Sequence, residues 1–301
     1  ACVGFPVIQV ETQWAREPRE YLDKGLALVA EHAGQPLLDF ALAPHSMYTL
    51  DEDMLAEVSR VSEESGLRIH LHLLETGFEI EHALAHHDTQ PLEFADRLGL
   101  LSDRLIAVHM AHLEDADIGL LAERGVHVVH CPQSNLKLAS GTCRVSDLVS
   151  AGVNVCVGTD GAASNNDLDL LDELRTAALM AKGVSGDPCS VDAVTALDLV
   201  TVNAALALGI EDRVGSIEAG READLCAVDL ASVRTQPVHD VISQLVYAAA
   251  ASQVSDVWVR GRRLLAEGEL QTLDEARLLE RVDDWSARVA HGRPRASRVA
   301  S

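Results

Sequence analysis

Short apolar runs alternate along the first half of the chain with longer stretches whose apolar residues recur every three to four positions. The short runs predict strands and the longer stretches predict helices. We expect strands at residues 2–10, 37–43, 68–74, 104–110, 126–131 and 153–159. We expect helices between them at residues 19–32, 51–65 and 113–124. This βα alternation predicts parallel strands joined by crossover helices.

The six βα units before residue 166 fit either an eight-stranded barrel, which would need two more units, or a doubly wound sheet. The polar residues favour the barrel, because they fall at or just beyond the C-terminal ends of different strands, where barrel active sites assemble. These residues are His45, His72, Glu75, His109 and Asp160.

Beyond residue 160 the pattern changes. We expect helices at residues 168–182 and 190–208, followed by short strands near 223–228 and 254–259 that form a small separate sheet. The last residues from about 291 are rich in arginine and serine and predict a disordered tail.

Composition narrows the functional classes. The chain has 301 residues, of which 48% are hydrophobic, and this is ample for a buried core. Its net charge of −23 comes from scattered acidic residues, which argues against nucleic acid as a partner because phosphate binding needs a basic face. The sequence shows no run of eighteen apolar residues and no leader-like start, so we expect a cytoplasmic protein without a membrane partner. Six cysteines without a CxxC pair indicate reduced thiols.

Two histidines and an aspartate at strand ends are candidate metal ligands. Strand alternation places His70 and His72 on the same side, and neutral imidazole is a preferred zinc ligand. His109 ends an apolar strand, and Asp160 closes another within a Gly-Thr-Asp-Gly segment. An aspartate beside a divalent ion stays ionised and can also act as a base. The structural alternatives are hydrogen-bonded barrel histidines and a turn aspartate that caps the next helix.

Further polar residues follow the same strands. Glu75, just past the strand that holds His72, is placed to contact a substrate beside the metal and to carry protons. His45 follows another strand and is a candidate for contacting substrate hydroxyls. The loop at residues 130–138 is suited to hydrogen-bonding the metal ligands, with a purely structural loop as the alternative. The candidates for this supporting role are Ser134, Asn135, Ser164 and Asn165.

Four stretches carry a resemblance to a known family. They are HLLET at 72–76, HCPQSNLKLASG at 130–141, GTDGAASNNDLDLLDELRTAAL at 158–179 and VGSIEAGREADLCAVD at 214–229. With these stretches the chain resembles the amidohydrolase superfamily, specifically the bacterial 5-methylthioadenosine/S-adenosylhomocysteine deaminases and their triazine-hydrolase relatives. The resemblance spans nearly the whole chain.

The resemblance implies a distorted (β/α)₈ TIM-like barrel with one divalent metal per subunit, usually zinc, with Fe²⁺ or another divalent metal as the alternative. His72, His109 and Asp160 resemble the family's metal ligands, and Asp160 also its base. Glu75 resembles the glutamate that contacts the purine ring nitrogen, and His45 the histidine that contacts substrate. The implied catalytic residues are therefore Glu75, His109 and Asp160. Relatives are often homo-oligomers, and the resemblance is compatible with a homo-oligomeric assembly of this chain.

One departure from the family concerns the start of the chain. Members begin their barrel with an HxH pair on the first strand, after strands of a composite β-sandwich, and neither is present here. We therefore expect an N-terminally truncated chain. The expected division is a partial barrel at 1–209, a sandwich remnant with a returning helix at 210–270, a C-terminal helix at 271–290 and a disordered tail at 291–301.

The expected function is zinc-dependent hydrolytic deamination of an adenine nucleoside, from 5-methylthioadenosine or S-adenosylhomocysteine to the inosine analogue and ammonia. One alternative is deamination or dechlorination of another heterocycle, such as guanine, 8-oxoguanine or a triazine. The other is a non-catalytic fragment that lacks the first-strand HxH. Catalytic zinc generally needs at least three protein ligands besides water, and without that pair the site keeps only His72, His109 and Asp160.

Overall fold

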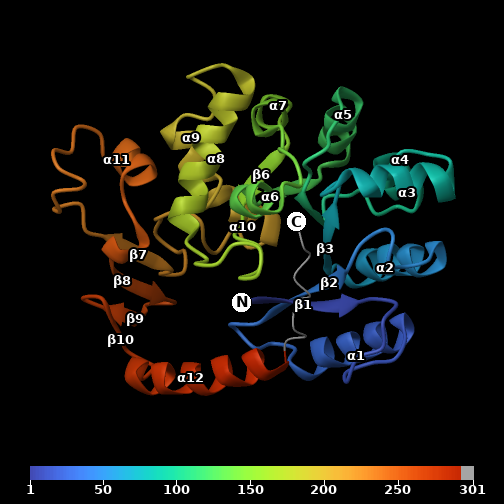
Figure 1. Cartoon of the computed structure of the whole chain (residues 1–301), viewed down its shortest axis with the longest axis horizontal. Helices are drawn as coiled ribbons and strands as arrows, with labels where there is room; N and C mark the ends of the chain where they lie inside the picture. Colours follow the sequence, from blue (N-terminus) through green and yellow to red (C-terminus); the bar gives the residue numbers. More distant parts are fainter. Residues whose placement is uncertain (293–301) are drawn as a thin grey trace, which may run out of the picture.

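A computed structural model describes residues 1–292. Its first part is a sheet of six parallel strands in sequence order, each paired with the next along the chain (Figure 1). Apart from their ends, the six strands coincide with the six that the apolar runs predict. They are β1 (Cys2–Val7), β2 (Asp39–Pro44), β3 (Arg68–Leu73), β4 (Leu105–His109), β5 (His127–His130) and β6 (Asn154–Val157).

Helices follow the strands and lie around the outside of this sheet (Figure 1). The predicted helices at 19–32, 51–65 and 113–124 are present, and short helices that the pattern did not predict lie between them. The helices of this part are α1 (Pro18–Glu31), α2 (Glu52–Ser65), α3 (Gly77–His87), α4 (Pro91–Arg97), α5 (Asp115–Arg124), α6 (Pro132–Leu138), α7 (Val145–Ser150), α8 (Leu170–Ser185), α9 (Ala193–Asp198) and α10 (Val202–Leu208).

Local sequence fixes several of these helix ends. The Asp51 carboxylate accepts the Met54 amide at 2.8 Å and so caps the start of α2. Gly66 and Gly125 end α2 and α5 with φ of 74° and 68°, a left-handed conformation that glycine adopts without strain. These capping and stop residues thus define where α2 begins and where α2 and α5 end.

The sheet is not closed into a barrel within residues 1–292, and β1 and β6 are its outer strands. The segment after α8 covers the free edge of β6. The Val157 amide donates to the Leu199 carbonyl at 3.1 Å, and the Asn203 side-chain amide donates to the Val155 carbonyl at 2.9 Å. These bonds satisfy backbone groups that an open edge strand would expose.

The same bonds explain a wrong prediction. The helix expected at 190–208 is interrupted, because α9 ends at Asp198 and α10 begins at Val202. The break includes Val200 and Thr201, whose β-branched side chains slightly lower helix propensity. It frees the Leu199 carbonyl for β6, so pairing with the sheet overrides helical periodicity here.

The C-terminal part forms a second, antiparallel sheet of four strands in the order β10-β9-β8-β7. Its helix α12 lies along the lower side of the molecule in Figure 1, and the large apolar side chains Leu279, Val282 and Trp285 on it are more than half exposed. The elements are β7 (Leu225–Val228), α11 (Val241–Tyr247), the 3₁₀-helix η1 (Ala251–Gln253), β8 (Val254–Val259), β9 (Arg262–Ala266), β10 (Glu269–Leu270) and α12 (Glu275–Gly292). The predicted tail at 291–301 falls, from residue 293 on, outside the described residues.

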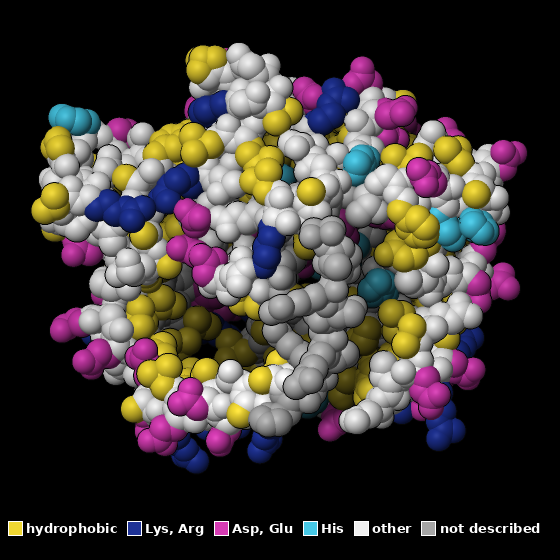
Figure 2. All heavy atoms as spheres, viewed as in Figure 1, with side chains coloured by type: hydrophobic (Ala, Val, Ile, Leu, Met, Phe, Trp, Pro, Cys, Tyr) yellow, Lys and Arg dark blue, Asp and Glu magenta, His cyan; other side chains and the backbone are white. Residues whose placement is uncertain are grey.

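Burial and charge agree with this arrangement. Strand residues such as Leu71, Leu105, Val128 and Val155 are fully buried in one continuous core. Acidic side chains are spread over the visible surface in Figure 2 rather than gathered on one side. Within residues 1–292, no helix has the length and apolarity needed to cross a bilayer.

Candidate active site

Three histidines from consecutive strands gather at the C-terminal edge of the six-stranded sheet. His45 follows β2, His72 lies in β3 and His109 ends β4. The ring centroids of His72 and His109 are 5.1 Å apart, and those of His45 and His72 are 6.3 Å apart. The His70 ring lies beside that of His72, with centroids 6.3 Å apart, as alternation along β3 predicts. The parallel sheet therefore brings these rings into one group.

The His109 side chain contacts two other residues that the sequence singles out. The residue is 1% exposed, and its Nδ1 lies 3.2 Å from Asn135 Oδ1. Its Nε2 lies 3.8 Å from Glu75 Oε2. When Nδ1 carries the hydrogen and donates it to the Asn135 amide oxygen, Nε2 keeps a lone pair that faces Glu75. Asn135 thus contacts a predicted metal ligand, and its supporting role stays a prediction.

The Asp160 carboxylate lies after β6 and accepts three hydrogen bonds. Ser134 Oγ and Ser164 Oγ donate to Oδ2 at 2.7 and 2.6 Å, and the Gly161 amide donates to Oδ1 at 2.7 Å. Burial alone would raise the pKa of Asp160, but the bonds from Ser164, Ser134 and Gly161 and the nearby His109 together lower it. The carboxylate is therefore ionised at neutral pH. Both serines contact this predicted ligand, and their supporting role stays a prediction.

Burial keeps His72 uncharged. It lowers the pKa of His72 to about 4, and the neighbouring rings of His109 and His70 act in the same direction. At neutral pH the ring is therefore neutral, which is the form of imidazole that binds a metal. Neutral imidazole and ionised carboxylate are both groups that zinc binds.

Glu79 was not singled out by the sequence reasoning, yet it holds the loop that carries Glu75. Its carboxylate is buried and accepts the backbone amides of Leu74, Glu75 and Thr76 at 2.9, 2.7 and 3.2 Å. Thr76 and Glu79 form the capping box at the start of α3. A Thr-x-x-Glu pattern before a helix is the signal that could have identified this residue.

Residues in the left-handed backbone conformation concentrate at this edge. Leu74, His109, Met110 and Asp160 have φ of 50°, 78°, 49° and 61°. Residues with a side chain rarely adopt such values, which cost energy and persist where the surrounding structure holds them. Each of these residues lies within or next to a predicted site segment, so the backbone is held in an uncommon shape where the polar side chains meet.

Asn165 contacts a buried carboxylate instead of a predicted ligand. Its Nδ2 donates to Glu173 Oε1, and the Gln133 amide donates to Glu173 Oε2 at 3.2 Å. Glu173 is 0% exposed, and burial raises its pKa to about 7. This carboxylate, on α8, joins the start of α6 to the loop after β6, and the supporting role of Asn165 stays a prediction.

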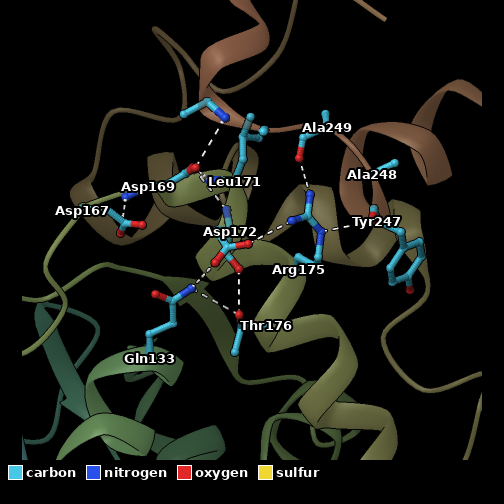
Figure 3. A network of polar contacts seen from close by, with 12 residues as sticks. Gln133, Asp167, Asp169, Leu171, Asp172, Arg175, Thr176, Tyr247, Ala248 and Ala249 are labelled. Atoms are coloured by element: carbon cyan, nitrogen blue, oxygen red, sulfur yellow. Dashed lines mark hydrogen bonds and ion pairs between the residues drawn. The ribbon is translucent and has the colours of Figure 1, made fainter. Parts of the chain in front are cut away.

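A polar network at the first turns of α8 ties α6 to the C-terminal part (Figure 3). Gln133 Nε2 donates to Asp172 Oδ2 at 2.7 Å, and Arg175 Nη1 donates to Asp172 Oδ1 at 2.9 Å. The Arg175 guanidinium also donates to the carbonyl oxygens of Tyr247, at 3.1 Å from Nε, and Ala249. Ser134 and Asn135 lie in α6, so the prediction of a loop at residues 130–138 is wrong for most of that segment. This helix is thereby braced against the end of α11.

The three predicted metal ligands have the right chemistry but are not assembled around one point. Among residues 1–292, no three His, Cys, Asp or Glu side chains lie close enough together to hold a metal ion. His72 and His109 are neighbours, and Asp160 is near enough to influence the pKa of His72. The assignment of His72, His109 and Asp160 as a ligand set therefore stays a prediction.

Comparison with known proteins identifies the family. Six parallel strands paired in chain order, without the reversal of strand order typical of a doubly wound sheet, and polar residues at their C-terminal edge define a barrel-type α/β protein. Residues 1–264 match the Amidohydrolase family, and the chain belongs to that family.

Two similar curated proteins have the same enzyme name. A 5-methylthioadenosine/S-adenosylhomocysteine deaminase of Teredinibacter turnerae is 42% identical over 93% of this chain and 64% of its own length. One of Moorella thermoacetica is 44% identical over 87% of this chain and 61% of its own length. The chain thus spans less than two thirds of these relatives.

Solved structures confirm the fold. A zinc-bound adenosine deaminase from Xanthomonas campestris has a TM-score of 0.94 and 46% identity, covering 96% of this chain and 66% of that one. A zinc complex of atrazine chlorohydrolase from Arthrobacter aurescens has a TM-score of 0.87 at 23% identity, covering 94% and 65%, a likeness in fold alone. The predicted fold class, a metal-dependent hydrolase barrel incomplete in this chain, is thereby confirmed.

Proposed function

We propose that the protein to which this chain belongs deaminates an adenine-type nucleoside by hydrolysis, with 5-methylthioadenosine or S-adenosylhomocysteine as substrate. The observation that carries the proposal is the gathering of His72, His109, Glu75 and Asp160 at one sheet edge in a chain 42% identical to a deaminase of these two nucleosides.

A zinc ion is the proposed cofactor, with His72, His109 and Asp160 as the residues that would hold it. Both the adenosine deaminase and the chlorohydrolase named above contain zinc. When bound, such an ion lowers the pKa of water and so supplies a nucleophile at neutral pH. The side chains would need to move closer together than they lie here, or to be joined by other donors, since three protein ligands are usual for catalytic zinc.

The chain's own residues would carry the proton transfers. Water adds to the ring carbon that bears the exocyclic amine, and that carbon then loses ammonia. Asp160, ionised and held by three hydrogen bonds, takes the proton from water and passes it to the departing amine. Glu75 delivers a proton to the adjacent ring nitrogen and recovers one from the added hydroxyl as the ring carbonyl forms, with His109 beside it at 3.8 Å. His45 is proposed to contact the sugar hydroxyls.

Ammonia release tests the proposal. The full chain, loaded with zinc, is incubated with 5-methylthioadenosine or S-adenosylhomocysteine, and ammonia and the inosine product are quantified. Asp160→Asn and Glu75→Gln should each lower turnover by at least about 100-fold, the usual contribution of a general acid or base. Glu81→Gln, an exposed change on α3, is the matched control and should leave turnover unchanged.

A second candidate is that this 301-residue chain is non-catalytic on its own. The absence of a three-donor group within residues 1–292 favours it. Zinc content of the purified chain separates the two candidates: close to one ion per chain supports the enzyme, and none supports the non-catalytic chain. Turnover of guanine or a triazine, with none of the adenine nucleosides, would instead support another heterocycle as substrate.

A further inference from the structure

Three histidines lie on α3, outside the residues proposed for deamination. They are His82, His86 and His87, on the helix that begins behind the Glu75 loop. Histidine side chains gather at the surface over α3 in Figure 2. His82 and His87 are half-buried and His86 is exposed. Nothing in the proposed reaction uses these imidazoles, so the cluster calls for its own explanation.

His82 and His86 are four residues apart and therefore share one face of the helix. Their rings stack with centroids 4.1 Å apart and an interplanar angle of 18°. Two imidazoles on adjacent helical turns can direct nitrogens at one ion after small rotations about their side-chain bonds, the arrangement that i, i+4 histidine pairs use for zinc. The spacing and the contact thus provide two ligands side by side.

One hydrogen bond selects the tautomer of the His86 ring that leaves Nε2 free to bind a metal. His86 Nδ1 lies 2.9 Å from the carbonyl oxygen of His82 and can only donate to it, because the carbonyl is an acceptor. The hydrogen is then on Nδ1, and Nε2 keeps its lone pair. Metal-binding histidines commonly donate their other ring N–H to a carbonyl or carboxylate in this way. His86 therefore already makes the hydrogen bond to a carbonyl that metal-binding histidines commonly make through their other ring nitrogen.

We propose that His82 and His86 form a surface binding site for a divalent transition-metal ion of the nickel, copper and zinc group. Imidazole nitrogen selects these ions over magnesium and calcium, which prefer oxygen. Water completes the coordination, since the described part of the chain holds no third His, Cys, Asp or Glu within reach. The affinity should follow the order copper, then nickel, with zinc below copper.

His87 is not part of the pair. Its ring stacks on Phe94 with centroids 3.8 Å apart and an interplanar angle of 16°, and its centroid is 6.2 Å from that of His82. On a helix, residues five apart do not face the same way. His87 therefore packs against α4, and we assign it a structural role.

Calorimetric titration of the untagged full chain with Cu²⁺ or Ni²⁺ tests the site. His86→Gln removes one ligand at an exposed position and should weaken binding by roughly 100-fold, the lower end of the gain from linking two weak contacts. A matched variant combines His86→Leu with Leu179→His, an exposed position on α8, so composition is unchanged while the two imidazoles lie on different helices. It should lose affinity to the same extent.

His239→Gln is the control, because His239 is an exposed histidine elsewhere on the surface, and it should leave the affinity unchanged. Chemical modification of histidines by diethylpyrocarbonate, mapped by mass spectrometry with and without Cu²⁺, gives a second reading. Protection of His82 and His86 together supports the site. Equal Cu²⁺ affinity in the wild type and the relocated-histidine variant, or protection confined to His72 and His109, would overturn it. Neither reading depends on deaminase activity.

Discussion

The carboxylate of Glu79 accepts the backbone amide of Glu75 at 2.7 Å. It accepts the amides on either side of Glu75 as well, so one buried side chain fixes the backbone of the residue proposed to protonate the substrate. Leu74, just before Glu75, has φ of 50°, a value that needs such support. We interpret Glu79 as a positioning residue that acts through Glu75.

Replacing Glu79 should therefore loosen this loop. In Glu79→Ala, three backbone donors lose their acceptor, and the free energy of unfolding should fall by about 1–3 kcal/mol. Glu79→Gln keeps the size of the side chain but replaces one acceptor oxygen with a donor. Hydrogen exchange at residues 74–76 should accelerate in both variants.

The matched control is Glu81→Gln, which lies exposed on the same helix. In an active enzyme Glu79→Gln should lower kcat more than it raises KM, because the effect is on the orientation of Glu75. Unchanged exchange at residues 74–76 in Glu79→Gln would contradict the positioning role, whatever happens to activity.

Glu173 should make stability depend on pH. Its pKa is raised from 4.5 to about 7 because the carboxyl is buried. The folded chain therefore holds a proton that the unfolded chain has released, and stability falls as pH rises from about 4.5 to 7. The shift corresponds to at most about 3 kcal/mol at 25 °C.

Glu173→Gln mimics the protonated carboxyl and should remove this loss. Urea unfolding at several values between pH 5 and pH 8 gives the free energy of unfolding of both chains. The difference between variant and wild type should grow in favour of the variant as pH rises to 7, then level off. Curves that stay parallel over this range would show that Glu173 does not titrate there.

Arg175 should stabilise the junction between α8 and the end of α11. Its guanidinium bonds two carbonyl groups, of Tyr247 and Ala249, and one carboxylate, of Asp172 (Figure 3). Arg175→Met leaves both carbonyls without this donor, and we expect a loss of about 1–3 kcal/mol in the free energy of unfolding. Arg175→Lys should recover only part, since one ammonium cannot reproduce the planar fork of donors.

Hydrogen exchange locates the effect of these changes. Residues 247–251 should exchange faster in Arg175→Met, while strands β1 to β3 should be unaffected. Arg124→Met removes an arginine that is paired with Asp96 on the surface and serves as the comparison. It should cost less than about 1 kcal/mol, as exposed ion pairs do. Equal losses in the free energy of unfolding of Arg175→Met and Arg124→Met would mean that the hydrogen bonds of Arg175 contribute no more than an exposed ion pair.

The sequence predicted the strands well because buried parallel strands are continuous apolar runs, as in residues 105–108. It also predicted that polar residues at strand ends meet, since this follows from parallel strands alone. It did not predict the partners of these residues. Asn165 and Glu173 are eight residues apart in sequence and lie on either side of the start of α8, and only the folded backbone brings them together. The break between α9 and α10 depends in the same way on contacts with β6.

Asn135 should control the tautomer of His109. Its amide oxygen lies 3.2 Å from His109 Nδ1, so it favours the hydrogen on Nδ1 and leaves Nε2 free toward Glu75. In Asn135→Ala this acceptor is lost, and loss of such an outer partner usually lowers metal affinity or activity by roughly 10–100-fold. Asn135→Asp retains an acceptor oxygen and should keep the hydrogen on Nδ1.

Nitrogen-15 spectra of the His109 ring distinguish the tautomers directly, without zinc and without substrate. The wild type and Asn135→Asp should show the hydrogen on Nδ1, and Asn135→Ala a mixture of the two forms. Asn166→Ala, a change of the same kind in the loop after β6, should leave the His109 spectrum as in the wild type. A wild-type spectrum with the hydrogen on Nε2 would reverse the roles of the two ring nitrogens, because Nδ1 would then accept from the Asn135 amide group and Nε2 would donate toward Glu75. In that case His109 could not bind a metal ion through Nε2. Of the three ligands proposed in this chain, only His72 and Asp160 would then remain.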